Sequence, residues 1–88
     1  MKDNHIVLEM KGGLEYEYSR KLADQLRDLF TQDVDLRITL DLKELEFVGS
    51  SGIRNFVETV VQYKKENHNI ELINVRSEFQ KVFRLYIP

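Results

Sequence analysis

The chain has 88 residues, no cysteine and a formal net charge of −2, with 13 basic against 15 acidic side chains. A chain without cysteine has no disulfides, thiol catalysis or zinc–thiolate sites, and a balanced charge without a basic stripe argues against nucleic-acid binding. This length predicts a single domain over residues 1–88. Because the sequence has neither a signal-peptide pattern nor an apolar stretch of membrane-spanning length, we expect a cytoplasmic protein without membrane insertion.

The first part of the chain predicts a strand, a turn and a helix. Apolar side chains alternate over residues 5–10, which is typical of a strand, and Lys11-Gly12-Gly13 then predicts a turn. A helix follows at about 17–31, because apolar side chains recur at helical spacing, at Leu22, Leu26, Leu29 and Phe30.

Residues 36–42 have the most regular strand pattern of the chain. The apolar side chains of Leu36, Ile38, Leu40 and Leu42 alternate with the polar side chains of Arg37, Thr39 and Asp41. A strand buried on both faces would be apolar throughout. We therefore expect one face of the sheet to be exposed to solvent and the helices to cover mainly the other face.

The rest of the chain predicts a helix at about 51–66, a strand at 70–75 and a last helix that begins at Ser77. The first of these helices has an apolar stripe of Ile53, Phe56, Val57, Val60 and Val61, and the last has one of Phe79, Val82, Phe83 and Tyr86. Strands that alternate with helices favour parallel neighbours joined by right-handed crossovers. The predicted fold class is α/β, in the order β-α-β-α-β-α, with a mostly parallel sheet and helices mainly on one face.

The junction between the strand at 36–42 and the helix at 51–66 contains Gly49-Ser50-Ser51-Gly52. The first turn of a helix has unpaired backbone N–H groups and a partial positive charge, so a phosphate on a serine there would be stabilised. Serine is also a preferred N-cap residue and glycine is common in turns. The residues alone therefore favour simple capping over regulation.

The sequence gives less support to a catalytic or metal-binding function than to capping or regulation at this junction. Asp33, Asp35 and Asp41 could form a metal cluster, or Asp41 could accept a phosphoryl group, but the first strand lacks the acidic pair that would hold magnesium. A hydrolase nucleophile at the junction would need a general base, and neither His5 nor His68 has a partner at the required spacing. Both histidines are expected at the surface or at an edge. We expect no catalytic residue, no metal and no cofactor.

The segment from Asp41 to Val57 resembles the signature of STAS domains, in particular of bacterial anti-sigma-factor antagonists. The matching residues are Leu42, Leu45, Phe47, Val48, Ser50, Ser51, Gly52 and Ile53. The resemblance extends to the early Gly12-Gly13 pair and to the late segment from Arg76 to Tyr86. It implies helices packed largely on one face of a small sheet. It also implies an extra N-terminal strand and a C-terminal strand and helix, which we expect to be missing here.

The resemblance implies a function by partner switching. In that family the unmodified antagonist binds an anti-sigma factor with a serine-kinase fold, the kinase phosphorylates the first serine of the motif, and a PP2C-type phosphatase resets the protein. The phosphoacceptor here would be Ser50, with Ser51 as the second choice. Gly49 stands where the family usually has aspartate.

The partner-binding surface is expected at the start of the second helix, because Phe56, Val57 and Val60 are committed to the core by their spacing. The accessible residues that remain are Gly49, Ser50, Ser51, Arg54, Asn55 and Glu58. The sequence leaves open whether the protein forms a homo-oligomer. The alternative function is a non-phosphorylated STAS module, either a scaffold or a soluble subunit of a lipid-transport complex.

Overall fold

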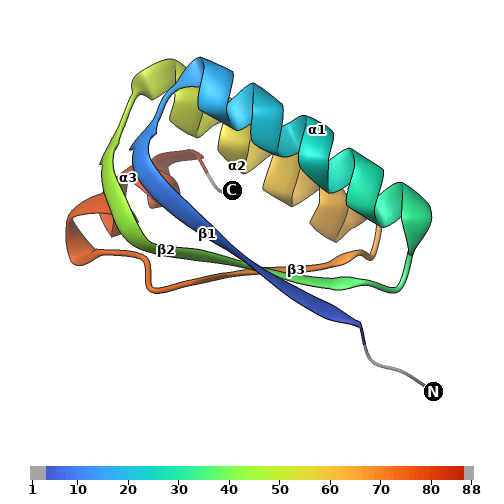
Figure 1. Ribbon diagram of the computed structural model, residues 1–88. Helices are drawn as coiled ribbons and strands as arrows, with labels where there is room; N and C mark the ends of the chain where they lie inside the picture. Colours follow the sequence, from blue (N-terminus) through green and yellow to red (C-terminus); the bar gives the residue numbers. More distant parts are fainter. Residues whose placement is uncertain (1–3, 87–88) are drawn as a thin grey trace.

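The computed structural model describes residues 4–86 and contains three strands and three helices in strict alternation (Figure 1). The order is β1 (His5–Leu14), α1 (Tyr16–Gln32), β2 (Arg37–Val48), α2 (Ser50–Lys65), β3 (Asn69–Ile73) and α3 (Ser77–Tyr86). The strands form one sheet in the order β1-β2-β3, and both strand pairs are parallel. The predicted α/β class and the order of its elements are confirmed.

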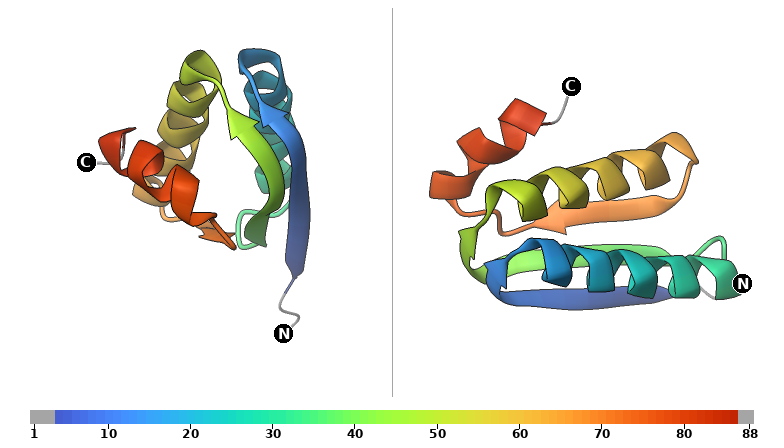
Figure 2. Two further views of the ribbon diagram at one scale, coloured as in Figure 1. Left: turned by 90° about the vertical axis from the view of Figure 1, so that its left-hand side faces the viewer. Right: turned by 90° about the horizontal axis from the view of Figure 1, so that it is seen from above.

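The two long helices cover one face of the sheet, as the sequence predicts. Figure 2 shows α1 and α2 side by side on that face, with α3 beside α2 at the β3 side of the molecule. The rings of Phe56 on α2 and Phe83 on α3 lie 6.0 Å apart between centroids. Phe79 and Phe83 are both buried, which confirms two positions of the predicted stripe of α3. The side chain of Tyr86 lies outside the part of the chain that the structure describes.

The core lies between the sheet and these helices, and the central strand β2 supplies much of it. Its apolar side chains, Ile38, Leu40, Leu42 and Leu45, are all at most 1% exposed. They pack with the stripes of α1 and α2, from which Leu26, Ile53 and Phe56 are equally buried. One polar residue departs from the expected pattern, because Thr39 is also buried. On the other face of the sheet, its hydroxyl bonds to His5 of β1 and to Glu71 of β3.

The predicted turn at Lys11-Gly12-Gly13 is wrong, because β1 continues through the two glycines to Leu14. Gly12 has φ 77°, a left-handed conformation that glycine adopts without strain, and the β1–β2 register shifts on either side of it. Gly13 lies opposite Phe47, and a β-carbon at Gly13 would overlap the Phe47 ring. The glycines thus let β1 stay paired with β2, which itself runs to Val48 rather than to the predicted residue 42.

The two histidines differ in their surroundings. His5 is exposed in the edge strand β1, as predicted. His68, which follows α2, is partly buried with 17% of its side chain exposed, and the centroid of its ring lies 4.4 Å from that of Phe30. His68 therefore contributes to packing at the end of the molecule remote from Ser50, and it is less exposed than the predicted surface or edge position implies.

Candidate functional site

The candidate site is the start of α2, where the chain leaves the carboxyl end of the central strand. Gly49 is the N-cap residue, with φ −90° and ψ 149°, and it has no side chain with which to cap the helix. Its N–H donates to the Leu14 carbonyl at 2.8 Å, and its own carbonyl accepts from the N–H of Ile53 at 2.8 Å. The first turn of α2 contains no acidic residue. Its positive end is therefore not balanced by a carboxylate from that turn.

Ser50 and Ser51 are the first two residues of α2, and both are exposed. A helix leaves the N–H groups of its first turn without intrahelical acceptors. A phosphoryl group on either hydroxyl would therefore lie close to several free backbone donors and to the positive end of the helix. This arrangement is suited to holding an anion, and it requires no change of fold.

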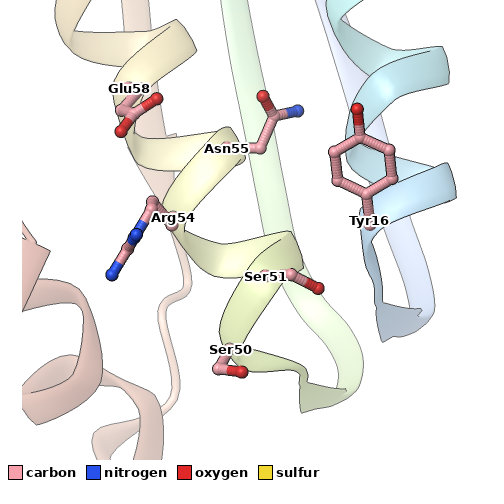
Figure 3. Close-up of a pocket in the computed structure, with 6 residues that line it drawn as sticks. All are labelled: Tyr16, Ser50, Ser51, Arg54, Asn55 and Glu58. Carbon is pink, nitrogen blue, oxygen red and sulfur yellow. The ribbon is translucent and has the colours of Figure 1, made fainter.

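The serines border an open hollow of about 450 Å³ (Figure 3). Six residues line it: Tyr16, Ser50, Ser51, Arg54, Asn55 and Glu58. The structure thus brings together all the residues predicted from the start of the second helix except Gly49, which precedes the hollow as the N-cap. Tyr16 is the addition that the sequence analysis did not identify.

The side chains of the hollow point to two sides of α2. In Figure 3, Ser51 and Asn55 face Tyr16 at the start of α1, whereas Arg54 and Glu58 project on the opposite side of the helix. Arg54 follows Ser50 by one helical turn, so the two residues lie on the same side of α2. The only basic side chain that lines the hollow is therefore one turn beyond the predicted phosphoacceptor.

Asn55 differs from the prediction that it lies on the outer face of the helix. It is half-buried, and its amide nitrogen donates to the Ser19 hydroxyl oxygen on α1 at 2.8 Å. Ser19 is 2% exposed. Since this bond joins α1 to α2 beneath the hollow, Asn55 has a structural role in addition to any contact with a partner.

Gly52 fixes the position of this site relative to the rest of the fold. A β-carbon at Gly52 would approach the Leu14 carbonyl oxygen and would lie 2.6 Å from the Glu15 carbonyl carbon and 2.8 Å from the Glu15 α-carbon. All three are backbone atoms, so none can move aside cheaply. Only glycine lets the first turn of α2 pack directly on the junction between β1 and α1.

The position of Tyr16 follows from the parallel sheet. Leu14 and Val48 are paired at the end of β1 and β2, so the residues that follow each strand emerge at the same edge of the sheet. Tyr16 begins α1 there and is 52% exposed. The predicted parallel order of the strands was the sequence signal that could have identified Tyr16. The turn predicted at 11–13 ended the first strand too early, so Tyr16 was not placed beside Ser50.

Asp41 has a structural role rather than the phosphoacceptor or metal-binding role considered from the sequence. One carboxylate oxygen accepts from the Lys43 backbone N–H at 3.0 Å and from the Asn74 side-chain amide at 3.0 Å. Asn74 follows β3 with φ 57°. The bond from Asn74 therefore joins the end of β3 to β2, whereas the bond from Lys43 lies within β2. Across residues 4–86, no group of three histidine or carboxylate side chains could hold a metal ion.

The bonds to Asp41 predict a pH dependence of stability. The hydrogen bond from Asn74, followed by that from Lys43, lowers the pKa of Asp41 below its ordinary value of 3.8. A carboxyl group with a lowered pKa stabilises the fold above its unfolded pKa, and this contribution is lost as the pH falls through the folded pKa. Asp41→Asn should therefore lower the urea midpoint near neutral pH, and the difference from the wild type should shrink below about pH 4. A difference that is constant with pH would contradict this role.

Comparisons with known proteins agree with this architecture. A family model described as "Mlab, STAS domain" matches residues 1–86. The anti-sigma-B factor antagonist of Bacillus subtilis (strain 168) is 28% identical over 81 residues, which cover 92% of this chain and 72% of that protein. The solved structure of the anti-sigma factor antagonist SpoIIAA in its unphosphorylated form matches with a TM-score of 0.72. That match has 18% identity and covers 97% of this chain and 77% of SpoIIAA, so it supports the fold.

Within residues 4–86, none of the helices is both long and apolar enough to cross a bilayer. The family assignment depends on the match that spans nearly the whole sequence and on the fold that agrees with it. The chain belongs to the STAS domain family.

Proposed function

We propose that this protein is an anti-sigma-factor antagonist that acts by phosphorylation-controlled partner switching, as a regulator in the cytoplasm and not as an enzyme. Without phosphate, it binds an anti-sigma factor of the serine-kinase type. The kinase then transfers the γ-phosphoryl group of ATP to the Ser50 hydroxyl, and the complex dissociates. A PP2C-type phosphatase removes the phosphate and restores binding.

The observation that carries this proposal is the position of Ser50. Its hydroxyl is exposed at the first residue of α2, beside a hollow and next to the unpaired donors of the helix start. The similarity to two proteins named as anti-sigma factor antagonists supports the same conclusion. Ser51 is the second choice, because it is equally exposed but faces Tyr16 and α1 (Figure 3).

The switch follows from charge. A phosphoserine has a charge of about −1.5 to −2 at neutral pH and three strong acceptor oxygens. Within this chain the helix start and Arg54 can stabilise that charge, so the domain stays folded. At an interface the same charge must be desolvated or must meet a matching cation, and without one it opposes binding. The proposed partner-binding surface comprises Gly49, Ser50, Ser51, Arg54, Asn55 and Glu58, with Tyr16 beside it.

Mapping of the phosphorylation site tests the proposal. The protein is incubated with its anti-sigma kinase and ATP, and the peptide that contains Ser50 and Ser51 is sequenced by mass spectrometry. We expect a single phosphate at Ser50 and none in Ser50→Ala. Phosphate found only at Ser51, or on neither serine, would reject the assignment.

A second candidate function is a non-phosphorylated STAS module, either a scaffold or a soluble subunit of a lipid-transport complex. The observation that favours it is Gly49, which leaves the N-cap of α2 without a carboxylate at the position where the resemblance to anti-sigma-factor antagonists implies aspartate. An aspartate at this position would serve as the N-cap and could also position the kinase. The two functions of that carboxylate can be separated by restoring it.

Gly49→Asp should be accommodated by the fold. Its φ of −90° is normal for any residue, and a β-carbon there would meet only the Leu14 carbonyl oxygen, at 3.6 Å. A side-chain cap in place of glycine should raise the unfolding free energy by a few tenths of a kcal/mol, which corresponds to a slightly higher Tm. If the kinase uses this carboxylate, phosphorylation of Ser50 should also become faster. A rise in Tm without faster phosphorylation would favour the scaffold function.

Charge reversal on α2 tests the proposed partner-binding surface. Arg54 and Glu58 are exposed, and neither is part of the core, so Arg54→Glu and Glu58→Lys should weaken partner binding with an unchanged circular dichroism spectrum. The matched controls on α1 are Lys21→Glu and Asp28→Lys, which are also exposed. Equal losses of affinity in the α1 variants would place the interface elsewhere.

A further inference from the structure

The proposed function does not involve the outer edge of β1, which is the edge that faces away from β2. β1 pairs with β2 on one side only, because it is the first strand in the sheet order. The Arg37 N–H donates to the Asn4 carbonyl at 3.0 Å, which sets the direction of the backbone groups along β1. In a parallel ladder these directions alternate, so the N–H and C=O groups of His5, Val7 and Glu9 point away from β2.

This open edge is short and has a defined end. The next outward N–H, that of Lys11, donates to the Tyr18 hydroxyl of α1 at 3.2 Å. Tyr18 therefore closes the edge beyond Glu9. Along the open part, the side chain of Val7 is 52% exposed. A row of unpaired backbone groups beside an exposed apolar side chain is a template for another strand.

We propose that this edge pairs with the same edge of a second copy of the chain, antiparallel, with Val7 opposite Val7. In this register His5 of each copy lies opposite Glu9 of the other. Each of the three residues whose backbone groups point away from β2 then lies opposite such a residue of the other copy. Each opposed pair exchanges two backbone hydrogen bonds. The open edge is therefore complementary to itself in both length and hydrogen-bonding pattern.

The side chains favour the same register. It places the two exposed valines against each other, and each imidazole against a carboxylate, which are stabilising cross-strand pairs. A shift of two residues in either direction would put Val7 opposite His5 or Glu9 and leave outward groups unpaired. On the helix side, Ile6 of one copy would lie opposite Leu8 of the other. Leu8 borders a hollow of about 440 Å³ that is lined by residues of β1 and α1.

The proposed dimer does not depend on the phosphorylation switch. The open part of β1 lies at the amino end of the strands, and the start of α2 lies at their carboxyl end (Figure 1). Both copies would keep their Ser50 hydroxyls accessible. Loss of dimerisation and loss of partner switching can therefore be measured separately.

Single-cysteine cross-linking tests the register, because the chain has no cysteine of its own. Opposed residues of a hydrogen-bonded antiparallel pair have α-carbons about 5.5 Å apart, which is within disulfide range. Val7→Cys should therefore form a covalent dimer under mild oxidation. Val34→Cys is the matched control, since Val34 is 65% exposed and lies in the connection between α1 and β2 rather than on the edge strand. Glu9→Cys tests the register, because its two copies would be about 14 Å apart along the strands.

Sedimentation of the unmodified protein complements the cross-linking. We expect a reversible monomer–dimer equilibrium, and Val7→Lys should raise the dimer dissociation constant at least about tenfold by placing like charges opposite each other. The thermal transition of each variant reports whether it is folded. Sedimentation as a monomer at all concentrations would overturn the proposal, as would cross-linking of Val34→Cys as efficient as that of Val7→Cys. Efficient cross-linking of Glu9→Cys would overturn the register.

Discussion

Gly52→Ala should destabilise this domain by about 1–3 kcal/mol, which is the usual cost of forcing an extra group into a packed site. The added β-carbon would lie within 2.6 Å of the Glu15 carbonyl carbon, so α2 must move away from the junction between β1 and α1. The better intrinsic helix propensity of alanine, about 1 kcal/mol in a helix interior, has less effect in the first turn, where Gly52 lies, so the range above is a net cost. For a domain of this size each kcal/mol lowers the Tm by about 4–8 °C. Urea and thermal unfolding measure the change.

Gly49→Ala is the matched control for this prediction. It adds the same methyl group three residues earlier, where the nearest atom is the Leu14 carbonyl oxygen at 3.6 Å, an ordinary van der Waals distance. Because alanine is a poorer N-cap residue than glycine, we expect this variant to lose at most about 1 kcal/mol, which is less than the loss in Gly52→Ala. If Gly52→Ala were as stable as Gly49→Ala, the close approach of α2 to the β1–α1 junction would be incorrect.

Ser50→Asp should abolish most partner binding and leave the fold intact. A carboxylate in the first turn of a helix is favourable by typically 0.3–1 kcal/mol, so the Tm should be unchanged or slightly higher. At the interface the same charge lacks a cation prepared for it, and we expect at least a tenfold loss of affinity, which is about 1.4 kcal/mol. Ser50→Ala, which removes the phosphoacceptor without adding charge, should bind the partner constitutively. Isothermal titration with the anti-sigma factor measures both.

Ser51→Asp is the control for position, since it places the same charge one residue further into the same helix turn. Ser51 faces Tyr16 and α1 rather than the tip of the helix, so its effect on binding should be smaller (Figure 3). A marked fall in the Tm of Ser50→Asp would indicate that Ser50 is structural. A larger loss of binding in Ser51→Asp would move the switch to Ser51.

Much of this fold could be predicted from local patterns. The alternation over 36–42 identified the central strand and its buried face, and the stripe from Ile53 to Val61 identified α2 and the start of the site. Patterns of this kind work because a residue's face is fixed by the period of its own element. The accessible side of α2 could therefore be derived without knowledge of its neighbours, and Ser50, Ser51, Arg54 and Glu58 are all exposed.

What the sequence did not predict depends on contacts between distant segments. The Gly12-Gly13 pair has the local composition of a turn, and only pairing with β2 keeps it in a strand that reaches Leu14. With β1 ended too early, neither the contact of Gly52 with Glu15 nor the place of Tyr16 beside the serines could be derived. Asn55 shows the same limit, since its burial depends on Ser19 of another helix.

The most direct test of the central claim compares the affinity of the anti-sigma factor for the unmodified protein and for the same protein phosphorylated at a single site. We predict that the protein phosphorylated at Ser50 binds at least about tenfold more weakly, with an unchanged circular dichroism spectrum and a Tm that is not lowered. Equal affinities of the two forms would contradict phosphorylation-controlled partner switching at the start of α2.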